Sequence, residues 1–413
     1  MSTKLTTDML NADIALSVIL DRTPVLGAEK VKLLSALGRT NAADIVADID
    51  LPPFANSSMD GFAVRSSDLS AATNATPVFL RVIGESSAGN VFGGTVVPGE
   101  AVRVMTGGVV PHGSDTVVPV EHVKELSGDQ IQCERPAVPG SCVRTKGEDI
   151  HKGDIVLQAG EQIGPPQLGI LAALGKAKIL VGRTPTVNIL STGDELVEID
   201  EEPAEGEIRN SSAFALAGYV TENGGVPRLL GIVRDRRKRM RKKIAEGMDA
   251  DILLVTGGVS AGKYDFVKET LENVDVQIQF SKLNIKPGKP LVFGTKGKTL
   301  VFGLPGNPVS TAVTFLQCVR PALLKMQGRT ELKPARHSAL LESTVTKEDG
   351  KRHFLRGIAR SVAGALRVRV TGIQSSGAMS SLSKANCLII IPENVQHLHE
   401  GESVDIEFLQ NPI

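Results

Sequence analysis

The stretch TGGVSAGKYDF, residues 256–266, comes close to a phosphate-binding loop. It fits the spacing G-x-x-x-x-G-K from Gly257 to Lys263 and follows DILLV, a strand-like apolar run. The next residue is Tyr264, where a P-loop requires the Ser or Thr hydroxyl that binds Mg²⁺. An acid, Asp265, stands at the start of the expected helix instead. Its carboxylate, rather than a hydroxyl, is the candidate metal ligand.

Further carboxylates follow other predicted strands. Asp194 and Glu195 lie in the turn STGDEL, and Asp235 follows the strand-like run LLGIV. The carboxyl ends of parallel strands meet at one edge of a sheet, and carboxylate oxygens are the ligands that Mg²⁺ prefers. Each acid alone also fits a helix-capping role. Their convergence on one edge predicts a magnesium site.

Lysines supply the opposite charge. The segment SKLNIKPGKP contains Lys282, Lys286 and Lys289 just before the strand-like run LVFG. Alternation and the Pro-Gly turn predict that two or three of these ammonium groups reach a polyanion, and a solvated surface run is the alternative. The basic run at 234–243 follows helical spacing, which indicates a solvated helix face rather than nucleic-acid recognition.

An open α/β sheet is expected to position these groups. From about residue 186, strand-like and helical runs alternate, which predicts a mainly parallel sheet with helices on both faces. Ligands bind such sheets outside the carboxyl ends of the strands. The turns expected there are 191–196, 256–265 and 303–308. Glycines such as Gly257 and Gly258 let the backbone approach a ligand, and Asn307 and Pro308 fit the N-cap and first position of the last helix.

The flanking regions have a different texture. Short Val-rich runs separated by Gly and Pro turns predict a β-rich domain from Pro77 to about Gly164, and a small β barrel or sandwich past Gly328. An N-terminal helix is expected, with Thr7 or Asp8 as its cap.

Composition narrows the class of protein. The 413 residues balance 46 Lys and Arg against 46 Asp and Glu, so no overall charge favours a nucleic-acid or membrane partner. The N-terminal 20 residues are interrupted by polar side chains, which argues against a signal peptide or membrane helix and predicts a cytoplasmic protein. The four cysteines lack C-x-x-C spacing, so buried inert thiols are expected.

Several motifs together resemble a known family. In order they are LPPFANSSMDGFAVRSSD, MTGGVVPHGSDTVVPVE, STGDEL, TGGVSAGKYDFVK, KLNIKPGKPLVFG and GLPGNPVS. This order is similar to that of the MoeA-type molybdopterin molybdenumtransferases, or molybdenum insertases, whose eukaryotic relative is the gephyrin E domain. The likeness covers essentially the whole chain. Two positions depart from it: Lys263 stands where the family commonly has an acid, and Phe266 replaces Tyr.

The resemblance implies a multidomain α/β plus β protein with four domains. They are an extended domain (27–50 and 147–178), a β-rich domain (51–146), a doubly wound α/β domain similar to the molybdopterin adenylyltransferases (1–26 and 179–328) and a C-terminal β-barrel-like domain (329–413). It also implies a homodimer with the active cleft between subunits. Further candidate partners are a molybdopterin adenylyltransferase and apo-molybdoenzymes.

The implied reaction belongs to molybdenum cofactor biosynthesis. Adenylylated molybdopterin and molybdate react with Mg²⁺ as cofactor, AMP is released, and molybdenum stays on the dithiolene. By motif match, the implied catalytic residues are Asp60, Glu195, Asp235, Asp265, Lys282 and Lys286, and the implied metal ligands are Asp265, Glu195 and Asp235. The implied substrate-binding residues are Thr106, Asp149, Asp194, Gly257, Gly258, Ser260, Lys289, Pro305, Pro308, Arg356, Ser375 and Ser376. From local sequence alone, Asp60, Thr106 and Asp149 also fit turn or cap roles.

Other functions stay open at this point. A nucleotide hydrolase would use the loop at 256–266 as a degenerate P-loop, although Tyr264 argues against it. A non-catalytic scaffold is another, since gephyrin also clusters receptors, but that role draws on an added N-terminal domain and a linker that these 413 residues do not contain. A preference for tungstate over molybdate is equally compatible with the sequence.

Overall fold

The computed structural model describes residues 9–234, 236–258 and 266–410. The chain forms two compact units. One comprises Met1–Ala43, Ala159–Gly164 and Lys178–Ile413, and the other Asp44–Gln158 and Pro165–Ala177. None of the helices in the described ranges has the length and apolar composition that crossing a lipid bilayer demands.

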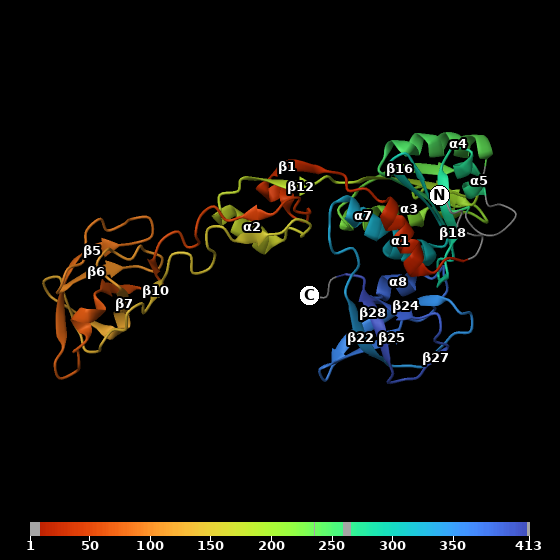
Figure 1. The fold of residues 1–413 in the computed structure, drawn as a ribbon. Helices are drawn as coiled ribbons and strands as arrows, with labels where there is room; N and C mark the ends of the chain where they lie inside the picture. Colours follow the sequence, from red (N-terminus) through yellow and green to blue (C-terminus); the bar gives the residue numbers. More distant parts are fainter. Residues whose placement is uncertain (1–8, 235, 259–265, 411–413) are drawn as a thin grey trace. The chain divides into compact units, whose positions relative to one another are not determined.

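A six-stranded sheet forms the centre of the first unit, in the order β16-β13-β17-β21-β20-β18 (Figure 1). The parallel strands are β13 (Thr186–Thr192), β16 (Val226–Val233), β17 (Ile252–Thr256) and β21 (Thr299–Leu304). The antiparallel strands are β18 (Gln277–Lys282) and β20 (Pro290–Lys296). The predicted open, mainly parallel sheet is thus confirmed, with an antiparallel pair at one side.

Helices cover both faces of this sheet, as Figure 1 shows. One face packs against α1 (Ala12–Arg22), α3 (Ser211–Glu222), α6 (Pro308–Thr314) and α7 (Arg320–Met326), and the other against α4 (Arg237–Glu246) and α5 (Phe266–Glu272). Alternation along the strands divides the side chains: Leu254 lies in the first core and Leu253 in the second. Because both faces are covered, β17 is buried throughout, and four of its five residues, Ile252 to Val255, are apolar.

The cap of α1 differs from the prediction. Thr7 and Asp8 lie outside the described residues, and Asn11 is the N-cap: its Oδ1 accepts hydrogen bonds from the backbone N–H groups of Asp13 (2.8 Å) and Ile14 (3.4 Å). Asn is among the best N-cap residues, so the apolar pattern placed the helix correctly but its start too early. The last helix also has an irregularity, a π-helical turn (Phe315–Val319) between α6 and α7.

A closed barrel follows the α/β domain. Its strands are β22 (Arg336–Leu341), β24 (Arg352–Val362), β25 (Ala365–Val370), β26 (Cys387–Ile391) and β28 (Ser403–Phe408). They pair in the order β24-β25-β22-β28-β26, and β26 returns to β24. The interior is filled by apolar side chains such as Leu341, Val368 and Ile389. The predicted C-terminal barrel is confirmed; β23 (Val345–Thr346), β27 (His397–Leu398) and α8 (Met379–Lys384) decorate it.

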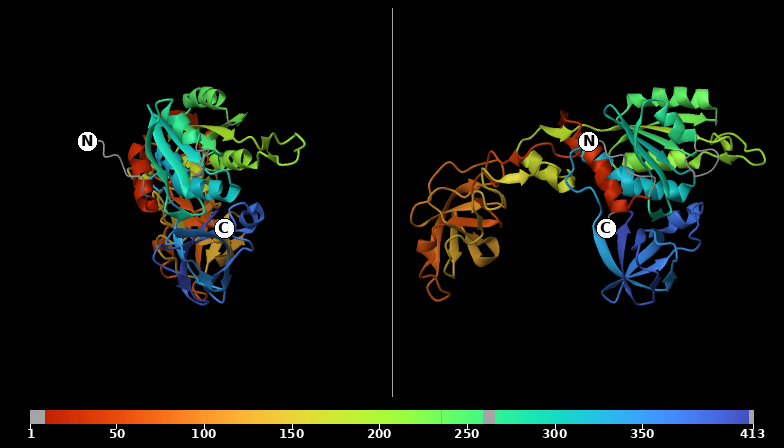
Figure 2. Two further views of the ribbon diagram at one scale, coloured as in Figure 1. Left: turned by 90° about the vertical axis from the view of Figure 1, so that its right-hand side faces the viewer. Right: turned by 45° about the vertical axis from the view of Figure 1, so that its right-hand side comes forward.

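One short strand joins the two domains. β19 (Ile285–Lys286) lies in sequence between β18 and β20 of the α/β sheet, but it pairs in parallel with β24 of the barrel. The partners are Ile285 with Arg352 and Lys286 with His353. Figure 2 shows the barrel (blue) beside the α/β domain in both views.

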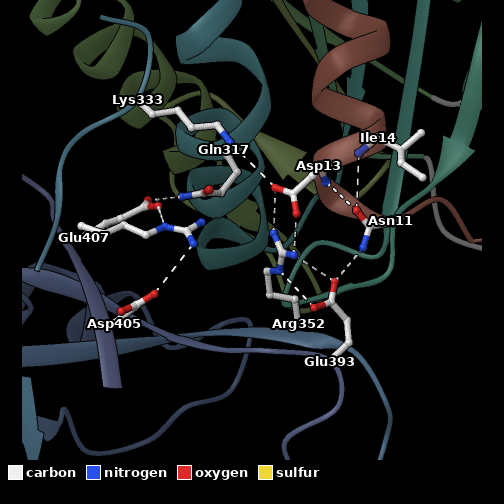
Figure 3. A network of polar contacts seen from close by, with 10 residues as sticks. Asn11, Asp13, Ile14, Gln317, Lys333, Arg352, Glu393, Asp405 and Glu407 are labelled. Carbon is white, nitrogen blue, oxygen red and sulfur yellow. Dashed lines mark hydrogen bonds and ion pairs between the residues drawn. The ribbon is translucent and has the colours of Figure 1, made fainter. Parts of the chain in front are cut away.

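A network of polar contacts reinforces this junction (Figure 3). Arg352 donates from both terminal nitrogens to the carboxylate of Asp13 on α1, at 3.0 and 2.7 Å, and also pairs with Glu393 at 3.2 Å. Asn11 donates to Glu393 at 3.0 Å. Hydrogen bonding to Arg352 outweighs burial and holds the pKa of Asp13 below its usual value. The N-terminus of α1 is therefore fastened to the barrel.

The remaining elements are short strands and one further sheet. In the first unit they are β1 (Ala28–Lys32), paired with β12 (Lys178–Gly182), and β14 (Leu196–Val197), paired with β15 (Ile208–Arg209). The second unit has a six-stranded sheet of β4 (Gly61–Val64), β5 (Val78–Ser86), β6 (Glu100–Val104), β7 (Thr116–Pro119), β8 (Val123–Leu126) and β9 (Gln130–Cys133). It also contains β2 (Ile45–Val46), β3 (Asn56–Ser57), β10 (Val143–Arg144), β11 (Ile155–Leu157) and α2 (Pro165–Ala173). The expected β-rich region is confirmed.

Candidate functional site

A pocket of about 1080 Å³ lies in the first unit, between the α/β sheet and the barrel. One wall is made by the turns that follow the parallel strands β13, β17 and β21. The other is made by β19 and the segment after it, β24, and the loop after β25. The volume is at the upper end of small-molecule sites, and the place is the carboxyl edge where open α/β sheets bind ligands.

Glycines let the strand ends approach one another in the first wall. Gly257 has φ of +94°, and a Cβ there would lie 2.1 Å from the backbone oxygen of Thr192. Only glycine fits a left-handed position pressed against neighbouring backbone. Gly306, by contrast, has room, since its added Cβ would meet only the Cα of Gly257 at 3.5 Å. Gly257 therefore allows the ends of β13 and β17 to lie in close contact at the floor of the pocket.

The buried guanidinium of Arg356 belongs to the opposite wall. The residue is fully buried, and its Nε donates to the hydroxyl of Ser381 at 3.1 Å while Nη2 donates to the carbonyl of Ser375 at 3.0 Å. Its Nη1 is also buried and has no hydrogen-bond partner among the described residues. Burial lowers the pKa of Arg356 from its ordinary value, and an arginine side chain stays charged at neutral pH. A buried cation with a free donor beside a pocket is suited to an oxyanion.

A hydrogen bond crosses from α6 to the barrel loop at the rim. The side chain of Asn307 makes no cap bond to its helix, but its Nδ2 donates to the hydroxyl of Ser376 at 3.0 Å. The backbone N–H of Val309 donates to the carbonyl of Ser376 at 3.1 Å. The predicted cap and first positions, Asn307 and Pro308, are confirmed, while the Asn307 amide serves the pocket rim instead of the helix.

A second charged group surrounds Lys286. Its Nζ lies 3.3 Å from Oδ2 of Asp349, which also pairs with Lys351 Nζ at 3.2 Å. The imidazole Nε2 of His353 lies 2.7 Å from Oδ1 of the same carboxylate. Burial would raise the pKa of Asp349, but hydrogen bonds from His353, Lys351 and Lys286 outweigh it and hold this pKa well below its usual value. Burial lowers the pKa of His353, more than Asp349 raises it, so this histidine is neutral at pH 7.

The lining is strongly cationic. The charged residues that line the pocket within the described ranges are Arg209, Lys286, Lys289, Lys351 and Arg356 on the positive side, and Glu195 on the negative side. Like charges gathered around one cavity raise the local concentration of a ligand of opposite charge. The pocket therefore fits a polyanion.

The structure brings together many of the sequence-predicted residues. Those that line the pocket are Glu195, Gly257, Gly258, Lys286, Lys289, Pro305, Pro308, Arg356, Ser375 and Ser376. Asp194, exposed on the same turn as Glu195, and Lys282, at the end of β18, do not line it. Asp235, Ser260 and Asp265 lie outside the described residues. The expected group of three lysines thus places two at the pocket and one away from it.

Three predicted residues belong to the second unit. Asp60 precedes β4 and Thr106 follows β6, and these antiparallel strands bring the two together. Oδ1 of Asp60 accepts from both the backbone N–H and the hydroxyl of Thr106, each at 2.7 Å, and the backbone bond contributes most to the lowered pKa of Asp60. Asp149 is exposed and its N–H donates to the carbonyl of Leu51 at 3.0 Å.

The described ranges offer few ligands for a metal ion. No group of three or more His, Cys, Asp or Glu side chains there could hold a metal ion, and only Glu195 of the predicted magnesium ligands is described.

All four cysteines are free. Cys133, Cys318 and Cys387 are buried, and burial raises the pKa of Cys133 to about 11 and those of the other two to about 12. Cys142 is only half-buried, which corrects the expectation for that residue.

Sequence reasoning missed several residues of the barrel wall. Lys351 and His353 line the pocket and Asp349 contacts both, yet none of the three was singled out. A signal existed, because they lie in the polar segment EDGKRH just before Arg356. Arg209 was also missed; it lines the pocket from β15.

Comparisons with known proteins cover nearly the whole chain. Residues 10–175 match the MoeA N-terminal region (domain I and II), residues 188–325 a probable molybdopterin binding domain, and residues 338–409 the MoeA C-terminal region (domain IV). A molybdopterin molybdenumtransferase of Haemophilus influenzae is 38% identical, over 97% of this chain and 98% of that protein. One of a Nostoc species is 34% identical, over 96% and 93%.

A solved structure has the same fold. The crystal structure of a molybdopterin biosynthesis MoeA protein from Pyrococcus horikoshii OT3 is similar with a TM-score of 0.84 and 33% sequence identity, and the match covers 97% of this chain and all of that one.

Proposed function

Because this chain belongs to the molybdopterin molybdenumtransferase (MoeA) family, we propose that it transfers molybdenum from molybdate to adenylylated molybdopterin with Mg²⁺-dependent release of AMP. Family membership assigns the chain to molybdenum cofactor biosynthesis as a transferase. The adenylylated form of the substrate, the release of AMP and the requirement for Mg²⁺ are what the proposal adds.

The cationic lining is the observation that carries the proposal. Molybdate is a dianion and the adenylylated pterin carries phosphates, so the two reactants repel each other. Lys286, Lys289 and Arg356 line a cavity that is large enough for both reactants. Fixed charges placed before the reaction need no rearrangement as an oxygen nucleophile approaches phosphorus, and this lowers the barrier.

The barrel wall suits the smaller oxyanion. Nη1 of Arg356 is buried and meets no hydrogen-bond partner within the described part of the chain, and the hydroxyl groups of Ser375 and Ser376 lie on the loop beside it. A guanidinium with hydroxyl neighbours matches the several oxygen acceptors of a tetrahedral oxyanion. Molybdate and tungstate share this chemistry, so the site is proposed for either. The α/β wall then receives the phosphates, next to the turns of Gly257 and Pro305.

Mg²⁺ is proposed at the α/β wall. Glu195 offers a carboxylate there, an oxygen ligand of the kind that Mg²⁺ binds, and Asp235 and Asp265 complete the proposed ligand set. When bound, the ion would neutralise phosphate charge and polarise the phosphoryl oxygens.

A reconstituted reaction tests the function. Purified protein with adenylylated molybdopterin, molybdate and Mg²⁺ is expected to release AMP and to yield cofactor that activates an apo-molybdoenzyme. Asp265→Ala is expected to lose Mg²⁺-dependent AMP release, whereas Asp275→Ala, at a carboxylate that is 92% exposed and paired only weakly with Lys296, keeps it. Phosphate release from ATP without any pterin would point to a nucleotide hydrolase and refute the proposal.

Replacement of Arg356 tests the oxyanion site. Arg356→Met is expected to raise the molybdate concentration for half-maximal rate at least ten-fold, about 1.4 kcal/mol. Running the titration with tungstate as well would reveal which oxyanion the pocket prefers. An unchanged molybdate dependence would remove Arg356 from the site.

The assembly and location follow the family resemblance. A homodimer working in the cytoplasm, with a molybdopterin adenylyltransferase as donor and apo-molybdoenzymes as acceptors, is part of the proposal. Asp60, Thr106 and Asp149 remain proposed contributors. Sedimentation velocity would test the homodimer, and a monomer that retains full turnover would contradict it.

A further inference from the structure

Asp349 is a meeting point of side chains from two domains. Its Oδ2 lies within 3.3 Å of Nζ of Lys286 and 3.2 Å of Nζ of Lys351, and its Oδ1 accepts from His353 at 2.7 Å. Lys286, Lys351 and His353 line the pocket, whereas Asp349 does not, and its side chain is only 25% exposed. A single carboxylate therefore forms ion pairs with two ammonium groups that line the pocket.

The backbone fixes this arrangement from both sides. β19 and β24 pair in parallel with Lys286 opposite His353, and the backbone N–H of Arg352 donates to the carbonyl of Asn284 at 3.1 Å. The Asn284 amide donates to the carbonyl of Gly350 at 3.1 Å. The lysine and the turn that carries the carboxylate are thus held together by main-chain contacts.

A buried lysine stabilises the same turn. Lys347 is only 5% exposed, and its ammonium donates to the carbonyls of Lys351 at 2.6 Å and Glu393 at 3.0 Å. Burying an ammonium group is costly unless its donors are used, so this residue is committed to the backbone. The turn around Asp349 is braced before any ligand arrives.

The charges leave the pair attractive to an anion. With His353 neutral, Lys286 and Lys351 contribute two positive charges against one from Asp349, so the cluster keeps a net positive charge. Each ammonium carries three N–H donors, and one carboxylate does not use them all. The side chain of Lys286 is 61% exposed and would sample many rotamers without a partner. A restrained lysine loses less conformational entropy when it binds an anion.

We propose that Asp349 is a positioning residue, which holds the ammonium groups of Lys286 and Lys351 side by side on the pocket wall as the receptor for an oxyanion. Lys351 thereby becomes a further anion-binding residue. The identity of the oxyanion, molybdate or a phosphate of the adenylylated pterin, rests on the proposed function, whereas the positioning itself does not. The tests below separate the two.

Lysine reactivity tests the positioning without any substrate. Trace acetylation followed by peptide mass spectrometry would compare Lys286 and Lys351 with Lys289, which lines the same pocket. An ion pair restrains an ammonium group and shields it from the reagent, so Asp349→Asn is expected to raise acetylation of Lys286 and Lys351 at least three-fold while Lys289 changes less than two-fold. Unchanged reactivity of both lysines would overturn the proposal.

A matched control addresses general effects of losing an acid. Glu342→Gln removes a carboxylate of the same barrel. This carboxylate pairs with Arg360 at a distance of 3.0 Å, and neither residue lines the pocket. The variant is expected to change none of the three lysine reactivities. An equal rise in this variant would show loosening of the barrel rather than positioning, and would overturn the proposal.

Steady-state kinetics identify the oxyanion. Asp349→Asn is expected to raise one KM at least five-fold with kcat changed less than two-fold: the KM for molybdate if the pair binds molybdate, or that for adenylylated molybdopterin if it binds phosphate. Asp349→Glu should restore part of the loss. In a background that lacks both lysines, Lys286→Met with Lys351→Met, Asp349→Asn should add less than two-fold, since the effect runs through the lysine pair.

Other results contradict the positioning role. A lower KM in Asp349→Asn would show that the carboxylate repels the ligand, and equal losses with and without the two lysines would show an independent role. If Asp349→Asn does not fold, Lys351→Met leaves the bond between Asp349 and His353 in place and must raise the same KM. Wild-type protein without turnover would refute the proposed function, while the acetylation result would still decide the positioning.

Discussion

The side chain of Asn307 donates its hydrogen bond to the hydroxyl of Ser376, 3.0 Å away in the barrel, although it stands at the cap of α6. The same barrel residue accepts a second bond from the backbone N–H of Val309. The first turn of α6 and the loop after β25 are therefore joined at the pocket rim. The bond sets the distance between the two walls from which the anion contacts are proposed to come.

Loss of the Asn307 amide should therefore weaken oxyanion binding. Asn307→Ala removes one hydrogen bond, about 0.5–1.5 kcal/mol, so the KM for molybdate is expected to rise roughly two- to ten-fold in the reconstituted reaction. Ser376→Ala should act similarly, and the double variant should be no worse than the poorer single one. Additive losses would show that the two residues act separately.

The glycines of the pocket floor should differ in their tolerance of a methyl group. Gly257→Ala would place a Cβ 2.1 Å from the oxygen of Thr192 at φ of +94°, and is expected to cost about 1–3 kcal/mol of stability and most of the turnover. Gly306→Ala has ordinary contacts and should stay within about 1 kcal/mol of wild type. Urea unfolding and AMP release measure both, and equal effects would contradict the strain.

The neutral state of His353 predicts a dependence of stability on pH. Burial lowers its pKa in the folded state, so below the ordinary value of about 6.5 the unfolded chain binds a proton that the folded chain does not. Stability should therefore fall as pH drops from 7.5 to 5.5. His353→Gln, which keeps a donor for Asp349, should lose less over this range, by urea midpoints. The exposed His399 of the same barrel provides the control, and a pH response carried equally by His399→Gln would refute the assignment.

Replacing Arg352 should lower the free energy of unfolding more than replacing either of its two acidic partners. Arg352→Met leaves Asp13 and Glu393 facing each other without their shared cation, and is expected to cost about 1–3 kcal/mol of unfolding free energy. Asp13→Asn should cost less than about 1 kcal/mol, because Asp13 is 57% exposed. Arg360→Met, at an exposed barrel pair, is the reference. A smaller effect for Arg352→Met than for Asp13→Asn would contradict the view of a shared cation.

Sequence reasoning succeeded where local pattern determines position. The strand ends that form the α/β wall follow from the alternation of apolar runs, so the turns at Glu195, Gly257 and Pro305 were placed at one edge, where the structure has them. Arg356 was found by its family motif. Its complete burial, and an Nη1 with no partner among the residues that the structure describes, were not expected, because both depend on packing between the barrel and the loop after β25.

Pairing between distant segments was not predictable from the same patterns. Lys282, Lys286 and Lys289 look alike in sequence, but β18 ends at Lys282, and only the next segment turns to pair with β24. That register, which also brings Asp349 to Lys286, pairs Ile285 with Arg352 and Lys286 with His353, residues that are 67 positions apart. No local periodicity encodes it.

The two-residue strand β19 has a consequence for how such chains can be recombined. It is encoded inside the α/β region yet completes its hydrogen bonds in the barrel, so exchanging C-terminal regions between relatives at the domain boundary would separate Lys286 from the carboxylate that restrains it. In such a chimera, the contact between β19 and β24 would join residues from two different proteins, even if each domain folded. The α/β domain and the barrel therefore have to be exchanged together, as one unit.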